Sequence, residues 1–137
     1  KLAIVETKAA AATVIDELET RLADVSDEIA RSPLTLHING CPNSCARIQT
    51  ADIGLKGQIV TDADGVQSAG YQVHLGGGLA SSERDEAGLG RTVRGLKVPA
   101  DGLADYVERV TRRFLQDRTG DETFATWAHR ADEEALQ

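Results

Sequence analysis

Apolar and polar residues follow two different periods along this chain, and each period predicts one kind of element. In residues 7–25, apolar side chains recur every three or four positions, which is typical of an amphipathic helix, and Thr7 is a candidate N-cap. The dipeptide Ser32-Pro33 interrupts this pattern. In residues 34–38, apolar and polar side chains then alternate, which predicts a strand with one buried face.

Two further alternating runs predict a β-hairpin. Residues 53–59 and residues 69–75 alternate in the same way, and the turn sequence Asp62-Ala63-Asp64-Gly65 lies between them. Gly76-Gly77-Gly78 begins a polar, glycine-containing loop that extends to about residue 90. A short strand is expected after this loop, at residues 92–98.

The last third of the chain predicts two helices. Pro99 begins the first and Gly120 ends it, and its apolar stripe comprises Leu103, Val107, Val110 and Phe114. Asp121 is the expected N-cap of the second helix, whose apolar face comprises Phe124, Trp127 and Ala128. Without an internal repeat, this order predicts a single α+β domain over residues 1–137. We expect a small mixed or antiparallel sheet with a hairpin, covered by an N-terminal helix and two C-terminal helices.

Composition and charge exclude several classes of protein. The chain has a formal net charge of −7, whereas a nucleic-acid surface needs clustered positive charge. No run approaches the ~18 apolar residues of a membrane span, and the first residues do not resemble a signal peptide. One closely spaced cysteine pair does not make the disulfide framework of a secreted domain. We therefore expect a cytoplasmic protein that binds neither nucleic acid nor membrane.

Cys41 and Cys45 are the two cysteines of the chain, and they lie on a predicted loop just past a strand. Gly40 permits unusual backbone angles and Pro42 stiffens the loop, so both sulfur atoms can face one object. We expect Cys45 to begin a short helix at residues 46–50. Backbone N–H groups at the start of such a helix favour the thiolate over the thiol.

Four interpretations of this pair remain open on spacing alone. The two thiols are structural, or they form a redox dithiol, although that motif typically has two intervening residues. A third interpretation is a zinc site formed with His37, although a histidine at such an alternating position in a strand faces solvent more often than it binds a metal. Lastly, they supply half of the four thiolates that an iron–sulfur cluster takes.

The cysteine loop is part of a longer sequence motif. Gly40-Cys41-Pro42-Asn43-Ser44-Cys45 is followed, after six residues, by Asp52-Ile53-Gly54-Leu55. This run resembles the signature of the sirohaem-containing nitrite and sulfite reductases: Gly-Cys, three residues, Cys, six residues, then an acidic, an apolar, a small and an apolar residue. The residue before the glycine is usually Ser, Thr or Val in that family, whereas here it is Asn39. The resemblance continues through Gly57 and the Gly-Gly pair after the second hairpin strand to the C-terminal helices.

The resemblance implies a 4Fe–4S cluster and sirohaem. In that family, four cysteines hold the cluster in two pairs, and Cys41 and Cys45 match the second pair. The first pair is expected immediately before Lys1, so the chain resembles a C-terminal fragment of a ferredoxin-dependent reductase. Such enzymes reduce sulfite to sulfide, or nitrite to ammonia, by six electrons, and the motif does not distinguish the two substrates. By this resemblance, the last cysteine, Cys45, is expected to supply the sulfur shared between cluster and sirohaem iron, while Cys41 is expected to bind the cluster alone.

The resemblance also implies roles for neighbouring residues. Asn43 is expected near the sirohaem, Arg47 is a candidate partner for a sirohaem carboxylate, and Gly76 and Gly77 are candidates for close packing near the cofactor. The cationic residues that bind the anion lie upstream in the family, so we expect no catalytic residue in this fragment and no activity from it in isolation. The alternative is a cluster-free binding module that uses Cys41, Cys45 and His37 as a zinc site.

Overall fold

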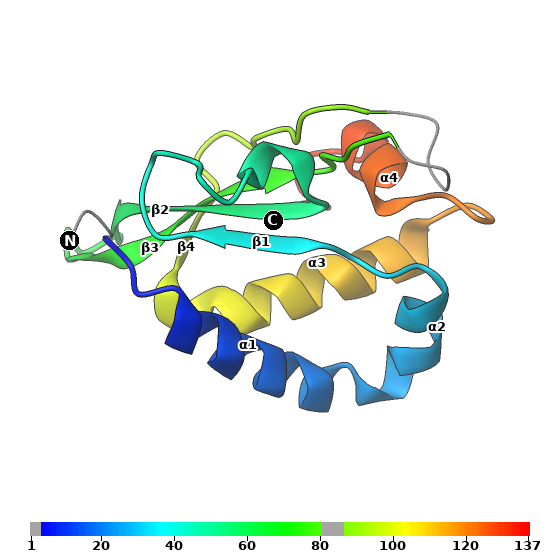
Figure 1. The fold of residues 1–137 in the computed structure, drawn as a ribbon, viewed down its shortest axis with the longest axis horizontal. Helices are drawn as coiled ribbons and strands as arrows, with labels where there is room; N and C mark the ends of the chain where they lie inside the picture. Colours follow the sequence, from blue (N-terminus) through cyan, green and yellow to red (C-terminus); the bar gives the residue numbers. More distant parts are fainter. Residues whose placement is uncertain (1–3, 81–86) are drawn as a thin grey trace.

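The computed structural model describes residues 4–80 and 87–137, and it contains one mixed sheet with helices on both of its faces (Figure 1). The α-helices are α1 (Lys8–Arg21), α2 (Ser26–Arg31), α3 (Leu103–Asp117) and α4 (Phe124–Arg130). The strands are β1 (Leu36–Asn39), β2 (Ile53–Thr61), β3 (Gln67–Leu75) and β4 (Lys97–Pro99). Three short 3-10 helices join them: η1 (Ala23–Val25), η2 (Ile48–Thr50) and η3 (Ala100–Gly102).

The sheet has four strands in the order β1-β2-β3-β4. β1 and β2 are parallel, whereas β2–β3 and β3–β4 are antiparallel, so the predicted α+β fold with a mixed sheet is confirmed. The hairpin turn forms where predicted, because the Asp62 carboxylate accepts the backbone N–H groups of Asp64 and Val66, both at 2.9 Å. No helix among the described residues is long and apolar enough to cross a membrane.

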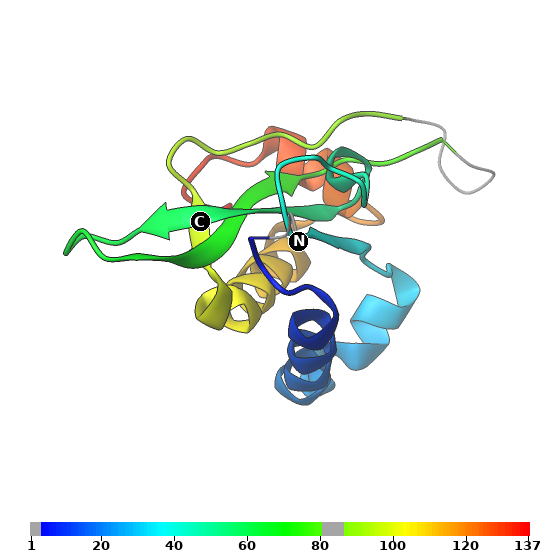
Figure 2. The ribbon, with the colours of Figure 1, turned by 60° about the vertical axis from the view of Figure 1, so that its left-hand side comes forward.

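The apolar face of the sheet packs against α1 and α3, which lie on the same side of it (Figures 1 and 2). The predicted apolar stripe of α3 is fully buried, which confirms that assignment. At the end of β3, α4 adds an aromatic cluster in which the rings of Phe114, Phe124 and Trp127 have their centroids 5.3–5.6 Å apart. This cluster joins α4 to the C-terminal half of α3.

The predicted N-terminal helix differs from the structure at both ends. Thr7 occupies the N-cap position of α1, but its side chain accepts no capping hydrogen bond. The Glu6 carboxylate accepts the N–H groups of Lys8 and Ala9 instead, at 3.0 and 2.7 Å. The helix ends at Arg21, and the chain continues through η1 into α2, which the periodicity did not predict.

Other element boundaries were also wrong in the prediction. The N-cap of α4 is Thr123, whose hydroxyl accepts the N–H of Thr126, and not Asp121. α3 ends at Asp117, and Gly120 lies in the connection with a φ of 57°. Of the strand expected at residues 92–98, only the end lies in β4. Ile59 is 49% exposed because the hairpin extends beyond the helices that cover the sheet (Figure 2).

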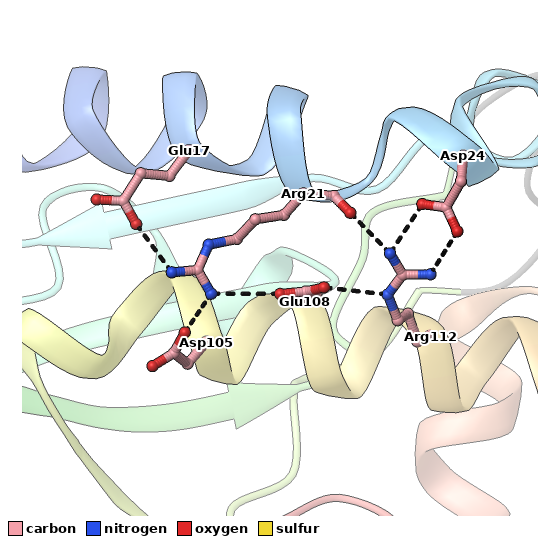
Figure 3. A network of polar contacts seen from close by, with 6 residues as sticks. All are labelled: Glu17, Arg21, Asp24, Asp105, Glu108 and Arg112. Atoms are coloured by element: carbon pink, nitrogen blue, oxygen red, sulfur yellow. Dashed lines mark hydrogen bonds and ion pairs between the residues drawn. The ribbon is translucent and has the colours of Figure 1, made fainter.

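A network of ion pairs joins α1 and η1 to α3 (Figure 3). Arg21 contacts Glu17, Asp105 and Glu108. Arg112 contacts Glu108 at 3.1 Å and Asp24 at 2.8 Å, and it donates to the backbone carbonyl of Arg21 at 2.7 Å. α1 needs these contacts because Val14 is its only buried residue among those that the structure describes.

We expect Arg112→Gln to loosen α1 and leave the rest of the fold intact. Backbone amide exchange should become several-fold faster in α1, because the guanidinium that joins Asp24, Glu108 and the Arg21 carbonyl is lost. The hydrogen bonds from Arg112 lower the pKa of Asp24, so this contact persists at neutral pH and is lost only as the pH falls through that lowered value. Hydrogen-exchange mass spectrometry at low salt measures the effect.

Arg113→Gln is the matched control for this measurement. Arg113 pairs with Asp117 within α3 and forms no ion pair to α1 among the described residues. Exchange in α1 should therefore stay at its original rate. Equal acceleration of α1 in the two variants would show that the network does not hold the helix.

The backbone of η2 packs directly on β2 and on the residues after β3. A Cβ atom added at Gly54 would lie 1.8 Å from the carbonyl oxygen of Ile48. One added at Gly77 would lie 2.1 Å from the carbonyl oxygen of Gln49. Ile48 is itself fully buried. Glycine is therefore required at both positions, because any side chain would displace η2.

Gly54→Ala should lower the free energy of unfolding by ~1–3 kcal/mol, the usual cost of overpacking. It should also speed labelling of the Cys41 thiol, because η2 anchors the loop that carries the cysteines. Gly88→Ala is the control, since an added Cβ there meets nothing within 4 Å. Chemical denaturation and thiol labelling measure both effects, and similar results for the two variants would contradict the steric argument.

Candidate metal centre

The cysteine loop, defined here as residues 40–47, lies on the face of the sheet opposite α1 and α3 (Figure 1). It leaves the end of β1 and returns through η2 to β2, so both of its ends are attached to the sheet. The carbonyl oxygen of Gly40 accepts the backbone N–H groups of Ile4 and Val5 at 2.7 and 3.0 Å. The N-terminal segment of the chain therefore lies beside the first residue of the loop.

Both cysteines are free thiols, but they differ in exposure. Cys41 is half-buried and Cys45 is exposed. Pro42 and Asn43, between them, are also exposed. The tip of the loop is therefore exposed, with Cys41 before it and Cys45 after it along the chain.

Hydrogen bonds within the chain fix the shape of this loop. The Nδ2 of Asn39 donates to the carbonyl oxygen of Cys41 at 2.6 Å and to its Sγ at 3.8 Å, and the Oδ1 accepts the N–H of Ala46 at 3.3 Å. The hydroxyl of Ser44 donates to Oε1 of Gln49 at 2.5 Å. The loop is thus held by side chains that lie before, within and after it.

The prediction of a short helix at residues 46–50 is wrong, because this helix does not form in the structure. Only η2 forms, because Arg47 adopts a left-handed backbone with a φ of 51° and interrupts any helix there. Ser44 is left-handed as well, with a φ of 57°. Cys45 lies in the turn between these two residues and not at a helix N-terminus. The expected stabilisation of its thiolate by helical N–H groups therefore has no basis.

The zinc alternative finds no support in the structure. The Nδ1 of His37 lies 3.3 Å from the carbonyl oxygen of Arg47, and His37 is only half-buried. In the described part of the chain, no three His, Cys, Asp or Glu side chains are grouped to hold a metal ion. Cys41 and Cys45 remain, and two thiols on one loop have the chemistry of half a 4Fe–4S ligand set.

Arg47 lines an open cavity of about 620 Å³ between the cysteine loop and the segments before β1 and α4. Asp52 lines the same cavity, but its carboxylate accepts the N–H and the hydroxyl of Thr35 at 2.9 and 3.0 Å. The Arg47 guanidinium forms no ion pair among the described residues, and the residue is exposed. The cavity thus offers a cationic group to an anionic ligand.

Gly76 and Gly77 are packed against other parts of this chain. Gly76 has a φ of 81°, its carbonyl oxygen lies 2.9 Å from Nε2 of His129, and an added Cβ would lie 3.0 Å from the Cβ of Ala128 in α4. Gly77 lies against the backbone of η2. These contacts explain why glycine stands at both positions. A contact of either residue with a cofactor stays a prediction.

Several polar side chains lie on the loop face of the sheet, and the strand pattern did not distinguish them from solvent-facing residues. Asn39 lies opposite Lys56 and belongs to the buried residues, with 7% exposure. His74, opposite Gly54, is half-buried, and burial together with the charge of Lys56 lowers its pKa. Both effects favour the neutral form of the His74 imidazole. The signal in the sequence was the phase of the alternation, because these residues share the face on which the cysteine loop lies.

Comparisons with known proteins identify relatives of this chain. Residues 26–137 match the family model described as the nitrite and sulphite reductase 4Fe-4S domain. The chain is 52% identical, over all of its 137 residues, to sulfite reductase (ferredoxin) 1 of Mycolicibacterium paratuberculosis, and it covers 24% of that protein. It is 40% identical over 79 residues to the chloroplastic ferredoxin–nitrite reductase of Betula pendula, which is 58% of this chain and 12% of that protein.

A solved structure extends the likeness to three dimensions. The NirA protein of Mycobacterium tuberculosis superposes with a TM-score of 0.91 at 48% identity, over 99% of this chain and 24% of that one. The chain thus spans about a quarter of the length of its mycobacterial relatives. It belongs to the nitrite and sulphite reductase 4Fe-4S domain family.

Proposed function

We propose that this chain is the part of a ferredoxin-dependent sulfite or nitrite reductase that supplies two of the four thiolate ligands of a 4Fe–4S cluster next to sirohaem. The observation that carries the proposal is the pair of free thiols on a loop attached at both ends, within a chain that matches the family over residues 26–137. The donor chemistry fits, because thiolates are the ligands of such clusters. Two ligands are too few for a stable cluster, so we expect the chain alone to be inactive.

Sulfite is the favoured substrate and ferredoxin the favoured electron donor. The relative named as a sulfite reductase (ferredoxin) is 52% identical over the whole chain. Nitrite is the second candidate, because the chloroplastic nitrite reductase of Betula pendula matches 58% of the chain. Residues that bind either anion are not assigned to this chain.

The position of the N-terminal segment supports a shared site. Ile4 and Val5 donate to the carbonyl oxygen of Gly40, the residue before Cys41, so a polypeptide that continues upstream of them starts beside the cysteine loop. A second cysteine pair immediately before Lys1 would then lie close to Cys41 and Cys45. Such a pair would complete the four ligands of the cluster.

The two thiols suit different roles. When bound, sirohaem supplies the iron at which the anion is reduced, and the cluster supplies the electrons. We assign the shared sulfur to Cys45, because its exposure leaves room for a second metal centre. Cys41 is half-buried beside Asn39, which suits a sulfur atom that contacts the cluster alone.

Two polar side chains complete the proposed cofactor site. Arg47 would pair with a sirohaem carboxylate from its cavity, because its guanidinium is exposed and carries a permanent charge. Asn43, at the exposed tip of the loop, would lie next to the macrocycle. Gly76 and Gly77 would contribute indirectly, since they seat η2 and α4 and thereby the loop.

Cys45→Ser and Cys41→Ser in the full-length reductase separate the two roles. Cys45→Ser should change the sirohaem absorption bands directly and abolish electron delivery to the anion, because serine replaces the shared sulfur. Cys41→Ser should affect the haem only through the cluster, so molecules that keep a cluster should keep near-normal haem bands. Visible spectroscopy, iron content and reductase assays measure these effects at matched cofactor content. An unchanged haem spectrum in a cluster-replete Cys45→Ser enzyme would refute the shared-sulfur assignment.

A further inference from the structure

We propose that Asn39 is a positioning residue that raises the reduction potential of the cluster by donating an N–H···S hydrogen bond to Cys41. This inference rests on the proposed function, because it requires that Cys41 binds the cluster. The inference gives a role to Asn39, which is not a metal ligand. Asn39 stands before the glycine of the motif, where the family usually has Ser, Thr or Val.

The side-chain amide of Asn39 makes three hydrogen bonds to the cysteine loop. The Nδ2 of Asn39 lies 2.6 Å from the carbonyl oxygen of Cys41 and 3.8 Å from its Sγ. The amide nitrogen carries two hydrogens, so one donates to each acceptor. The Oδ1 accepts the N–H of Ala46 at 3.3 Å, on the far side of Cys45. Asn39 therefore links the residues around both thiols.

Burial keeps this amide in place. Asn39 is the last residue of β1, it is 7% exposed, and its backbone pairs with β2 opposite Lys56. A buried amide that left the loop would lose all of its hydrogen bonds at once, which is costly where water does not replace them. The donor thus stays directed at Cys41 in the oxidised and the reduced state of a bound cluster.

An N–H group directed at a ligand sulfur favours the reduced cluster. Reduction adds one negative charge, which spreads over the thiolate sulfurs, and a fixed donor stabilises that charge. Removing the donor should therefore lower the potential. Valine has no donor, and the hydroxyls of serine and threonine lie on shorter side chains, so the usual residues of the family cannot reproduce this amide.

The test uses Asn39→Val and Asn39→Thr in the full-length reductase. Cluster content is measured first, in the original enzyme and in both variants, by iron analysis and visible spectroscopy. The cluster potential is then measured by a redox titration followed by electron paramagnetic resonance. The expected result is a shift of the one-electron equilibrium towards the oxidised cluster by up to about tenfold, which corresponds to ~59 mV.

Gln49→Ala is the matched control. It removes the hydrogen bond from Ser44 to Gln49, and so loosens the same loop, without removing a donor to sulfur. Its potential should equal that of the original enzyme. An equal shift in this control would overturn the inference, because loop mobility alone would then explain the effect.

The remaining outcomes also decide the question. An unchanged potential in cluster-replete Asn39→Val and Asn39→Thr overturns the inference and leaves the proposed function intact. Loss of the cluster from both variants overturns it too, because Asn39 would then serve assembly and not tuning. An original enzyme without a cluster would refute the proposed function itself, on which this inference rests.

Discussion

The contact between the backbone of η2 and the glycines beneath it is the constraint on which the cysteine loop depends. Gly54 on β2 and Gly77 after β3 lack the side chains that would separate η2 from the sheet, so the carbonyl groups of Ile48 and Gln49 approach directly. If side chains at these two positions separated η2 from the sheet, the loop would be able to move relative to the sheet. Here its return path is set by main-chain packing, which side-chain rotation cannot relax.

The two faces of the sheet have separate tasks. One face is apolar and packs on α1 and α3, and its side chains belong to the hydrophobic core of the fold. The other face carries Asn39, Lys56 and His74 beside the cysteine loop. Because side chains alternate along a strand, three strands in register place three polar residues on one surface without any cost to the core. The same alternation therefore encodes both the stability and the site.

Elements with a strong pattern were predictable from the sequence, and features that depend on single backbone angles were not. The hairpin turn at Asp62 and the stripe of α3 follow from local chemistry and periodicity. The N-cap of α4 is Thr123 and not Asp121, because it is the Thr123 hydroxyl that accepts the N–H of Thr126 in the first turn. The loop beyond Cys45 was expected to be helical because nothing in the sequence marks Arg47 as left-handed.

The same reasoning explains why Asn39 was visible in the sequence only as a departure from a motif. A sequence motif shows the metal ligands. A residue that orients a ligand is identified by its hydrogen-bond distances to the residues around that ligand, and only a structure gives these distances. In the structure its amide lies within hydrogen-bonding distance of the carbonyl oxygen and sulfur of Cys41 and of the N–H of Ala46. The glycines hold the base of the loop and Asn39 holds its interior, so contacts within this chain fix the loop backbone around the thiols. Such preorganisation lowers the ordering cost that cofactor binding would otherwise incur.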